Sequence, residues 1–210
     1  MTHSRTVQPA DSGVTDPDVG VEGNARLTSA TGVLLLVMFA VEGYTVLDVR
    51  GLITLHVFLG VMLLGPVLLK VGCTLYRFAR YYAGAEPYVR KGPPHIVLRV
   101  LGPLVTLSTL AVLGTGVALL AVHPGHGLLL LAHKASFIVW FGLMTVHVLG
   151  HLREAALSSW QEIVQSSTRQ RVRLGVLVIA VIVGVGSATA LLPSAAGWIH
   201  RSPVAGEHHH

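Results

Sequence analysis

Long apolar segments separated by short polar connections dominate the sequence. A helix needs about 20 apolar residues to cross a hydrocarbon core about 30 Å thick. Segments of that length are Leu27–Leu47, Gly51–Leu75, Val100–Val122, Leu128–Leu152 and Leu174–Leu192. The pattern predicts an all-α integral membrane protein, an up-and-down helical bundle with five transmembrane helices.

The connections between these segments predict how they are arranged. The first and second segments, and the third and fourth, are joined by so few residues that each pair must form an antiparallel hairpin. The predicted divisions are a disordered polar tail (1–24), a four-helix membrane bundle (25–152), an amphipathic linker (153–173), a fifth transmembrane helix (174–192) and an external tail (193–210). The linker is expected to lie on the membrane surface or to extend the fourth helix.

Composition and charge support a membrane location. Of the 210 residues, 52% are hydrophobic and 12% are charged, compared with about 25% charged in soluble domains. The net charge is +5, but the basic residues lie between apolar segments instead of forming one stripe, which argues against a nucleic-acid partner. Most of them fall in the N-terminal tail and after the second and fourth segments. Because basic loops are retained in the cytoplasm, we expect a cytoplasmic N-terminus and an external C-terminus.

The single cysteine, Cys73, limits the chemistry. It excludes an internal disulfide, a covalent Cys-x-x-Cys-His haem attachment and a Cys-ligated iron–sulfur cluster. Other side chains must therefore carry any redox function.

Three histidines lie within the apolar segments: His56, His133 and His147. Ionisable side chains at membrane depth are costly and normally face the bundle interior with a partner. His56 and His133 each lie about five residues from the outer end of their segments, so the hairpins place them at the same depth. His133 and His147 are 14 residues apart, about 21 Å along a helix with a residual rotation of about 40°, so both face one side of the bundle.

This pattern resembles the bacterial membrane b-type cytochromes, four-helix bundles in which histidines 13 or 14 residues apart clamp haems stacked across the membrane. The matching stretches are Leu55–Gly60, Ala132–Lys134 and Val146–His151. The resemblance implies haem b between His56 and His133, in a bacterial cytoplasmic membrane. The fifth helix departs from the pattern.

The sequence provides only one of the two histidine ligands expected for a second, inner haem. His147 would be one ligand, but the residue 14 positions after His56 is Lys70 instead of histidine. Three residues are candidates for the missing ligand: Lys70, His95 and His151. Loss of the inner haem is the alternative, so we expect one haem with a second left open.

Charged residues near these sites have two interpretations each. Arg50 and Lys134 near the outer level, and Arg99 near the inner one, are candidates to pair with haem propionates or to reach lipid headgroups. Glu42, near the outer end of the first segment, would exchange protons at a quinone site or simply reach water.

The predicted function is electron transfer, because a haem with two histidine ligands has no open site for oxygen. A quinol or a separate cytosolic reductase would donate electrons, since the sequence contains no flavin or nicotinamide fingerprint. The alternatives are a proton or metal transporter that uses the same histidines and a cofactor-free subunit of a larger complex. The closing histidines, 208–210, are excluded from this reasoning.

Overall fold

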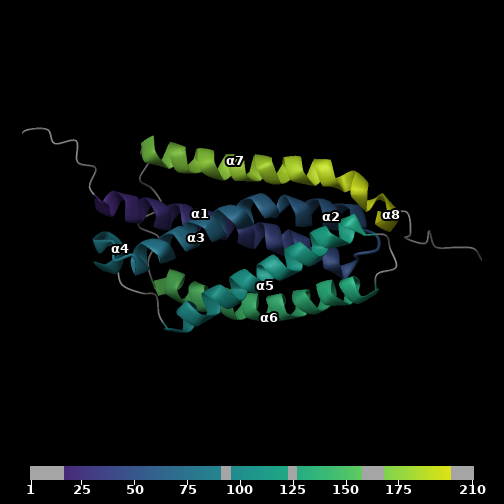
Figure 1. Ribbon diagram of the computed structural model, residues 1–210, viewed down its shortest axis with the longest axis horizontal. Helices are drawn as coiled ribbons and strands as arrows, with labels where there is room; N and C mark the ends of the chain where they lie inside the picture. Colours follow the sequence, from purple (N-terminus) through teal and green to yellow (C-terminus); the bar gives the residue numbers. More distant parts are fainter. Residues whose placement is uncertain (1–16, 91–95, 123–126, 158–167, 200–210) are drawn as a thin grey trace, which may run out of the picture.

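The computed structural model describes residues 17–90, 96–122, 127–157 and 168–199, and within these ranges it contains helices and no strand (Figure 1). The elements are α1 (Pro17–Leu47), α2 (Ile53–Met62), α3 (Leu64–Tyr82), α4 (Glu86–Arg90), α5 (Ile96–Ala121), α6 (Gly127–Leu157), α7 (Thr168–Leu191), the 3-10 turn η2 (Leu192–Ala195) and α8 (Ala196–Ile199). The prediction of an all-α chain is therefore confirmed.

Five helical stretches are long and apolar enough to cross a membrane. They are Gly20–Leu47, Ile53–Tyr82, Arg99–Ala121, Gly127–Gly150 and Arg171–Ile199. Large apolar side chains such as Val33, Leu107 and Phe141 are exposed on the outside of the bundle, where a soluble protein would expose charged ones. Each stretch contains most of one predicted apolar segment, and together they indicate a multi-pass membrane protein.

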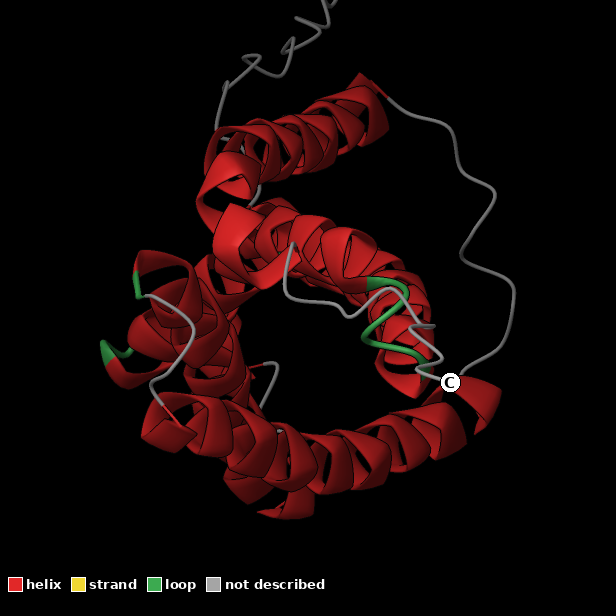
Figure 2. Ribbon diagram, turned by 90° about the vertical axis from the view of Figure 1, so that its right-hand side faces the viewer, coloured by secondary structure: helices red, strands yellow, loops and turns green. Residues whose placement is uncertain are grey.

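The helices form two groups that face each other. α5 and α6 pack together as one hairpin, while α1 packs against α2 and α3. α7 packs on α2, α3 and α1, and Figures 1 and 2 show it on the side of this group that faces away from α5 and α6. The architecture is thus a bundle of four spans with the fifth added outside.

The second span is interrupted between α2 and α3. α2 ends at Met62, Leu63 lies between the two helices, and Pro66 follows in the first turn of α3. Proline has no backbone N–H, so the carbonyl of Met62 loses its helical donor. The sequence predicts a kink at Pro66, and the helix does break within one turn of it.

Close packing of α7 against this interruption depends on two glycines. A Cβ placed on Gly65 would collide with the carbonyl oxygen of Ala180, and one placed on Gly184 would collide with the carbonyl oxygen of Met62. Small residues are what allow helix backbones to approach each other in membranes. The fifth span is therefore fitted to the break in the second.

Helical structure extends further at both ends than the apolar pattern indicates. α1 begins at Pro17, inside the predicted polar tail, and its first turns pack on α3: Val21 is buried and the side-chain amide of Asn24 donates to the carbonyl of Cys73 at 3.2 Å. Beyond Leu191, the chain continues through η2 and α8. In the linker, α6 extends to Leu157, and 158–167 lie outside the described residues.

Candidate functional site

A cavity of about 1030 Å³ lies between the two groups of helices. Its walls come from α1, α2, α5 and α6, together with the α1–α2 turn, and α8 contributes one residue. The polar, aromatic and glycine residues of the wall include Glu42, Arg50, His56, Gly60, Gly116, His133, Lys134, Trp140 and Trp198. Most of the other residues in the wall are apolar, as expected for a ligand pocket.

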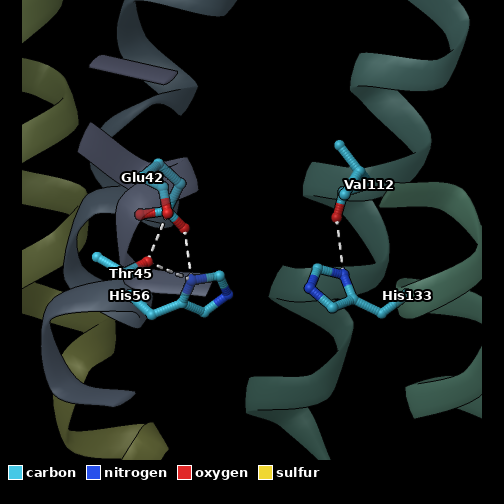
Figure 3. Close-up of polar contacts among 5 residues, drawn as sticks. All are labelled: Glu42, Thr45, His56, Val112 and His133. Carbon is cyan, nitrogen blue, oxygen red and sulfur yellow. Dashed lines mark hydrogen bonds and ion pairs between the residues drawn. The ribbon is translucent and has the colours of Figure 1, made fainter. Parts of the chain in front are cut away.

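His56 on α2 is held through Nδ1 by two residues of α1 (Figure 3). Thr45 Oγ1 and Glu42 Oε1 each lie 2.9 Å from this nitrogen. The Thr45 hydroxyl donates its own proton to the backbone oxygen of Glu42 at 2.6 Å, so it accepts from His56, and an ionised carboxylate only accepts. Nδ1 therefore donates a proton to these acceptors, and in a neutral His56 ring Nε2 is the nitrogen with the lone pair.

His133 on α6 is held in a parallel way by α5. Its Nδ1 lies 3.1 Å from the carbonyl oxygen of Val112 and 3.1 Å from Thr115 Oγ1. A carbonyl oxygen only accepts, and the Thr115 hydroxyl donates to the carbonyl oxygen of Ala111 at 2.7 Å. Nδ1 again donates a proton, and in a neutral His133 ring Nε2 is the electron-pair donor.

The two rings face each other across the cavity. Their centroids are 6.4 Å apart and their planes are inclined by 74°, and in Figure 3 the second nitrogen of each ring is directed toward the other. Two lone pairs cannot hydrogen-bond to each other, so the arrangement of two neutral rings suits a metal ion or another electrophile between them. Imidazole nitrogens lie about 2 Å from a bound transition metal, which puts two rings on opposite sides of one ion about 6 Å apart.

The space around this pair is large enough for a ligand of the size of a haem. Two glycines lie on the cavity wall close to this pair. Gly116 is next to His133, and Gly60 is next to Glu42, the partner of His56. A Cβ on Gly116 would come within 3.2 Å of His133 Cε1, and one on Gly60 within 3.3 Å of Glu42 Oε1. Both glycines therefore leave room for the histidines and their partners, and the cavity volume exceeds the 300–1,000 Å³ that is usual for ligand pockets.

The end of the cavity near the α1–α2 turn carries positive charge and the aromatic side chain of Trp198. Arg50 and Lys134 both line it, at the level where the sequence predicts partners for haem propionates. Trp198 of α8 also lines the cavity and donates from its indole nitrogen to the carbonyl of Leu119, in the last turn of α5, at 2.9 Å. The segment after α7 thus folds back over this end of the bundle.

A cluster of buried apolar residues lies at the other end of the cavity. The Trp140 side chain is 7% exposed and donates to Thr109 Oγ1 at 3.0 Å. Buried neighbours in the same cluster include Leu63, Val67 and Leu113. The cavity therefore ends near the middle of the bundle.

The structure brings only some of the predicted site residues together. His147 lies on α6, 14 residues after His133, and is half-buried. Lys70 is directed toward α1, where its Nζ donates to the carbonyl of Thr28 at 2.6 Å. His95 and the side chain of His151 lie outside the described residues. An inner haem thus stays a prediction.

Arg99 and Glu42 have partners that the apolar pattern does not reveal. Arg99 donates to the hydroxyl of Tyr82 at 2.5 Å. Glu42 is only 14% exposed and bonds to His56 instead of reaching water. The sequence reasoning also missed Thr45 and Thr115, although the spacing of Glu42 and Thr45 by three residues places them on one helical face.

Comparisons with known proteins do not identify the chain: no family model, no curated protein and no solved structure matches it. Among the described residues, no group of three or more His, Cys, Asp or Glu side chains is arranged to hold a metal ion. The facing pair of histidines in a large apolar cavity is therefore the feature on which a functional proposal must rest.

Proposed function

We propose that the chain is a membrane b-type cytochrome that holds one haem b between α2 and α6, with His56 and His133 as the axial ligands. The observation that carries this proposal is the 6.4 Å separation of the two imidazole rings, both with Nδ1 engaged by acceptors. The sequence resemblance to bacterial four-helix membrane cytochromes supports the same assignment.

Different residues of the chain would have different roles in binding the haem. His56 and His133 supply the two nitrogen ligands, and their Nδ1 contacts fix the ring tautomer and orientation, as hydrogen-bond partners of metal ligands usually do. The apolar walls would exclude water, and Arg50 and Lys134, which line the outer end of the cavity, would lie beside the haem propionates. Bound haem with both axial positions filled would pass single electrons without binding oxygen.

The proposed setting is a bacterial cytoplasmic membrane, with the N-terminus in the cytoplasm and the C-terminus outside. It follows from the distribution of Lys and Arg. A quinol in the bilayer or a cytosolic reductase would donate electrons, and ferric iron or a redox protein outside would accept them. Reporter fusions to each end would test the orientation.

An absorption spectrum of the purified protein, oxidised and then reduced with dithionite, tests the function. We expect sharp reduced haem bands in the wild type that disappear in His56→Ala and in His133→Ala. His147→Ala is the matched control, because it removes a histidine from the same helix as His133, and it should retain the bands. Colourless wild-type protein from haem-replete cells would overturn the proposal and favour a cofactor-free subunit or a proton or metal transporter.

A further inference from the structure

The two histidines of the proposed haem site have unequal partners. Each Nδ1–H is shared between a threonine hydroxyl and a second acceptor. For His133 that acceptor is the neutral carbonyl of Val112, but for His56 it is the carboxylate of Glu42, 2.9 Å away. The main difference between the two sides is therefore one negative charge.

The carboxylate is held firmly in the interior. Glu42 is 14% exposed, and the absence of a side chain at Gly60 makes room for its Oε1. Thr45, which shares the proton of His56, is fully buried. The position of Glu42 on α1 and that of His56 on α2 are thus set by the packing of the first hairpin.

Beside a neutral His56, the carboxylate of Glu42 has no counter-charge among its described contacts. The second oxygen, Oε2, is buried and has no hydrogen-bond partner within the described part of the chain. A buried carboxylate is costly unless it is paired. Within the described part of the chain, the side chain of Glu42 contacts His56 on the neighbouring helix α2, so a positive ion bound to the far nitrogen of His56 would compensate the charge.

From this geometry we infer that Glu42 is a positioning residue that sets the reduction potential of the haem bound by His56. This inference rests on the proposed function. The negative charge favours the oxidised site, which carries one more positive charge than the reduced one, and so it lowers the midpoint potential. One electron enters and one leaves, no bond of the protein forms or breaks, and the proton stays on His56 Nδ1.

A potentiometric titration of the haem-loaded, full-length protein tests the inference. Glu42→Gln keeps the shape of the side chain and removes the charge. We expect its midpoint potential to rise by at least 59 mV, which is a tenfold change in the ratio of reduced to oxidised haem for one electron. The electron paramagnetic resonance spectrum of the oxidised protein should change as well, because His56 becomes a weaker electron donor.

Thr115→Val is the matched control. It removes a neutral hydroxyl from His133 Nδ1 and leaves the carbonyl of Val112 as acceptor, so the ratio of reduced to oxidised haem at a given potential should change less than threefold. A Glu42→Gln protein that retains haem with the wild-type potential would overturn the inference and leave the cytochrome proposal intact. A colourless wild type would overturn both.

If Glu42→Gln does not retain haem, Thr45→Val tests the same inference with the Glu42 charge still present. With the threonine oxygen removed, Glu42 becomes the only acceptor of the His56 proton, the hydrogen bond to the carboxylate strengthens, and the midpoint potential should fall below that of the wild type. An unchanged or higher potential in Thr45→Val would refute a role for the Glu42 charge.

Discussion

His56 and His133 face each other with their ring planes inclined by 74°. The angle is set by partners on different helices, because Glu42 and Thr45 of α1 orient one ring while Val112 and Thr115 of α5 orient the other. The relative rotation of the two hairpins thus determines how the proposed axial ligands are arranged.

The steep angle between the rings predicts the magnetic properties of the oxidised protein. Near-perpendicular imidazole planes leave the iron d orbitals close in energy, which gives a low-spin signal with large g anisotropy. We expect such a signal in the electron paramagnetic resonance spectrum of the purified oxidised protein at low temperature. The smaller anisotropy that parallel rings produce would show that the two hairpins are oriented differently when haem is bound.

Gly116 should be required for haem binding because of the space it leaves next to His133. A Cβ there would already lie 3.2 Å from His133 Cε1, and a leucine would extend into the cavity. Overpacking costs about 1–3 kcal/mol, so Gly116→Leu should lower the haem affinity on the order of tenfold or more. Haem content per chain, measured after purification, checks this result.

Gly114→Leu is the control for this substitution. It lies two residues away on α5, is exposed, and a Cβ there would have no neighbour within 4 Å. It should leave haem content unchanged. Equal loss in both variants would mean that leucine disturbs α5 itself and not the cavity, and retention in both would contradict the assignment of this cavity to haem.

The five long apolar helices could be predicted from the sequence, because a helix that crosses lipid requires about 20 consecutive apolar residues. The equal depth of His56 and His133 could be predicted too, since short connections fix the hairpins. Depth alone, however, does not determine rotation. The contact of Glu42 with His56 depends on how α1 turns relative to α2, which the apolar pattern leaves undetermined because lipid-facing and buried positions are both apolar.

The contact made by Trp198 could not be predicted from the apolar pattern either. Trp198 follows the last apolar segment at a position that the hydropathy pattern assigns to an external tail, yet it contacts the carbonyl of Leu119 on α5. Such a contact depends on the path of η2 and α8, and a single tryptophan near a helix end is equally typical of the membrane interface.

The close packing of α7 against the interrupted second span predicts that alanine substitutions at two glycines of α7 change the stability of the protein differently. In Gly184→Ala, the new methyl group would collide with the carbonyl oxygen of Met62, so the helices must separate, at a cost of about 1–3 kcal/mol. Thermal unfolding in detergent, followed by circular dichroism, should show a lower Tm.

Gly186→Ala provides the comparison, because a Cβ at this position has no neighbour within 4 Å. Its Tm should equal or slightly exceed that of the wild type, since alanine favours helix. If Gly184→Ala were as stable as Gly186→Ala, the close contact between α7 and Met62 would not exist in the membrane protein.

The orientation of the Lys70 side chain predicts how many haems the chain binds. It stands 14 residues after His56, but the interruption at Leu63 intervenes, and its Nζ bonds to the carbonyl of Thr28 on α1. The cluster around Trp140 fills the bundle below the cavity. We therefore expect one haem per chain, and Lys70→His should still give one, because an imidazole at this position would face α1. Two haems per chain in either protein, by combined haem and protein quantitation, would show that residue 70 faces His147 and that the inner site exists.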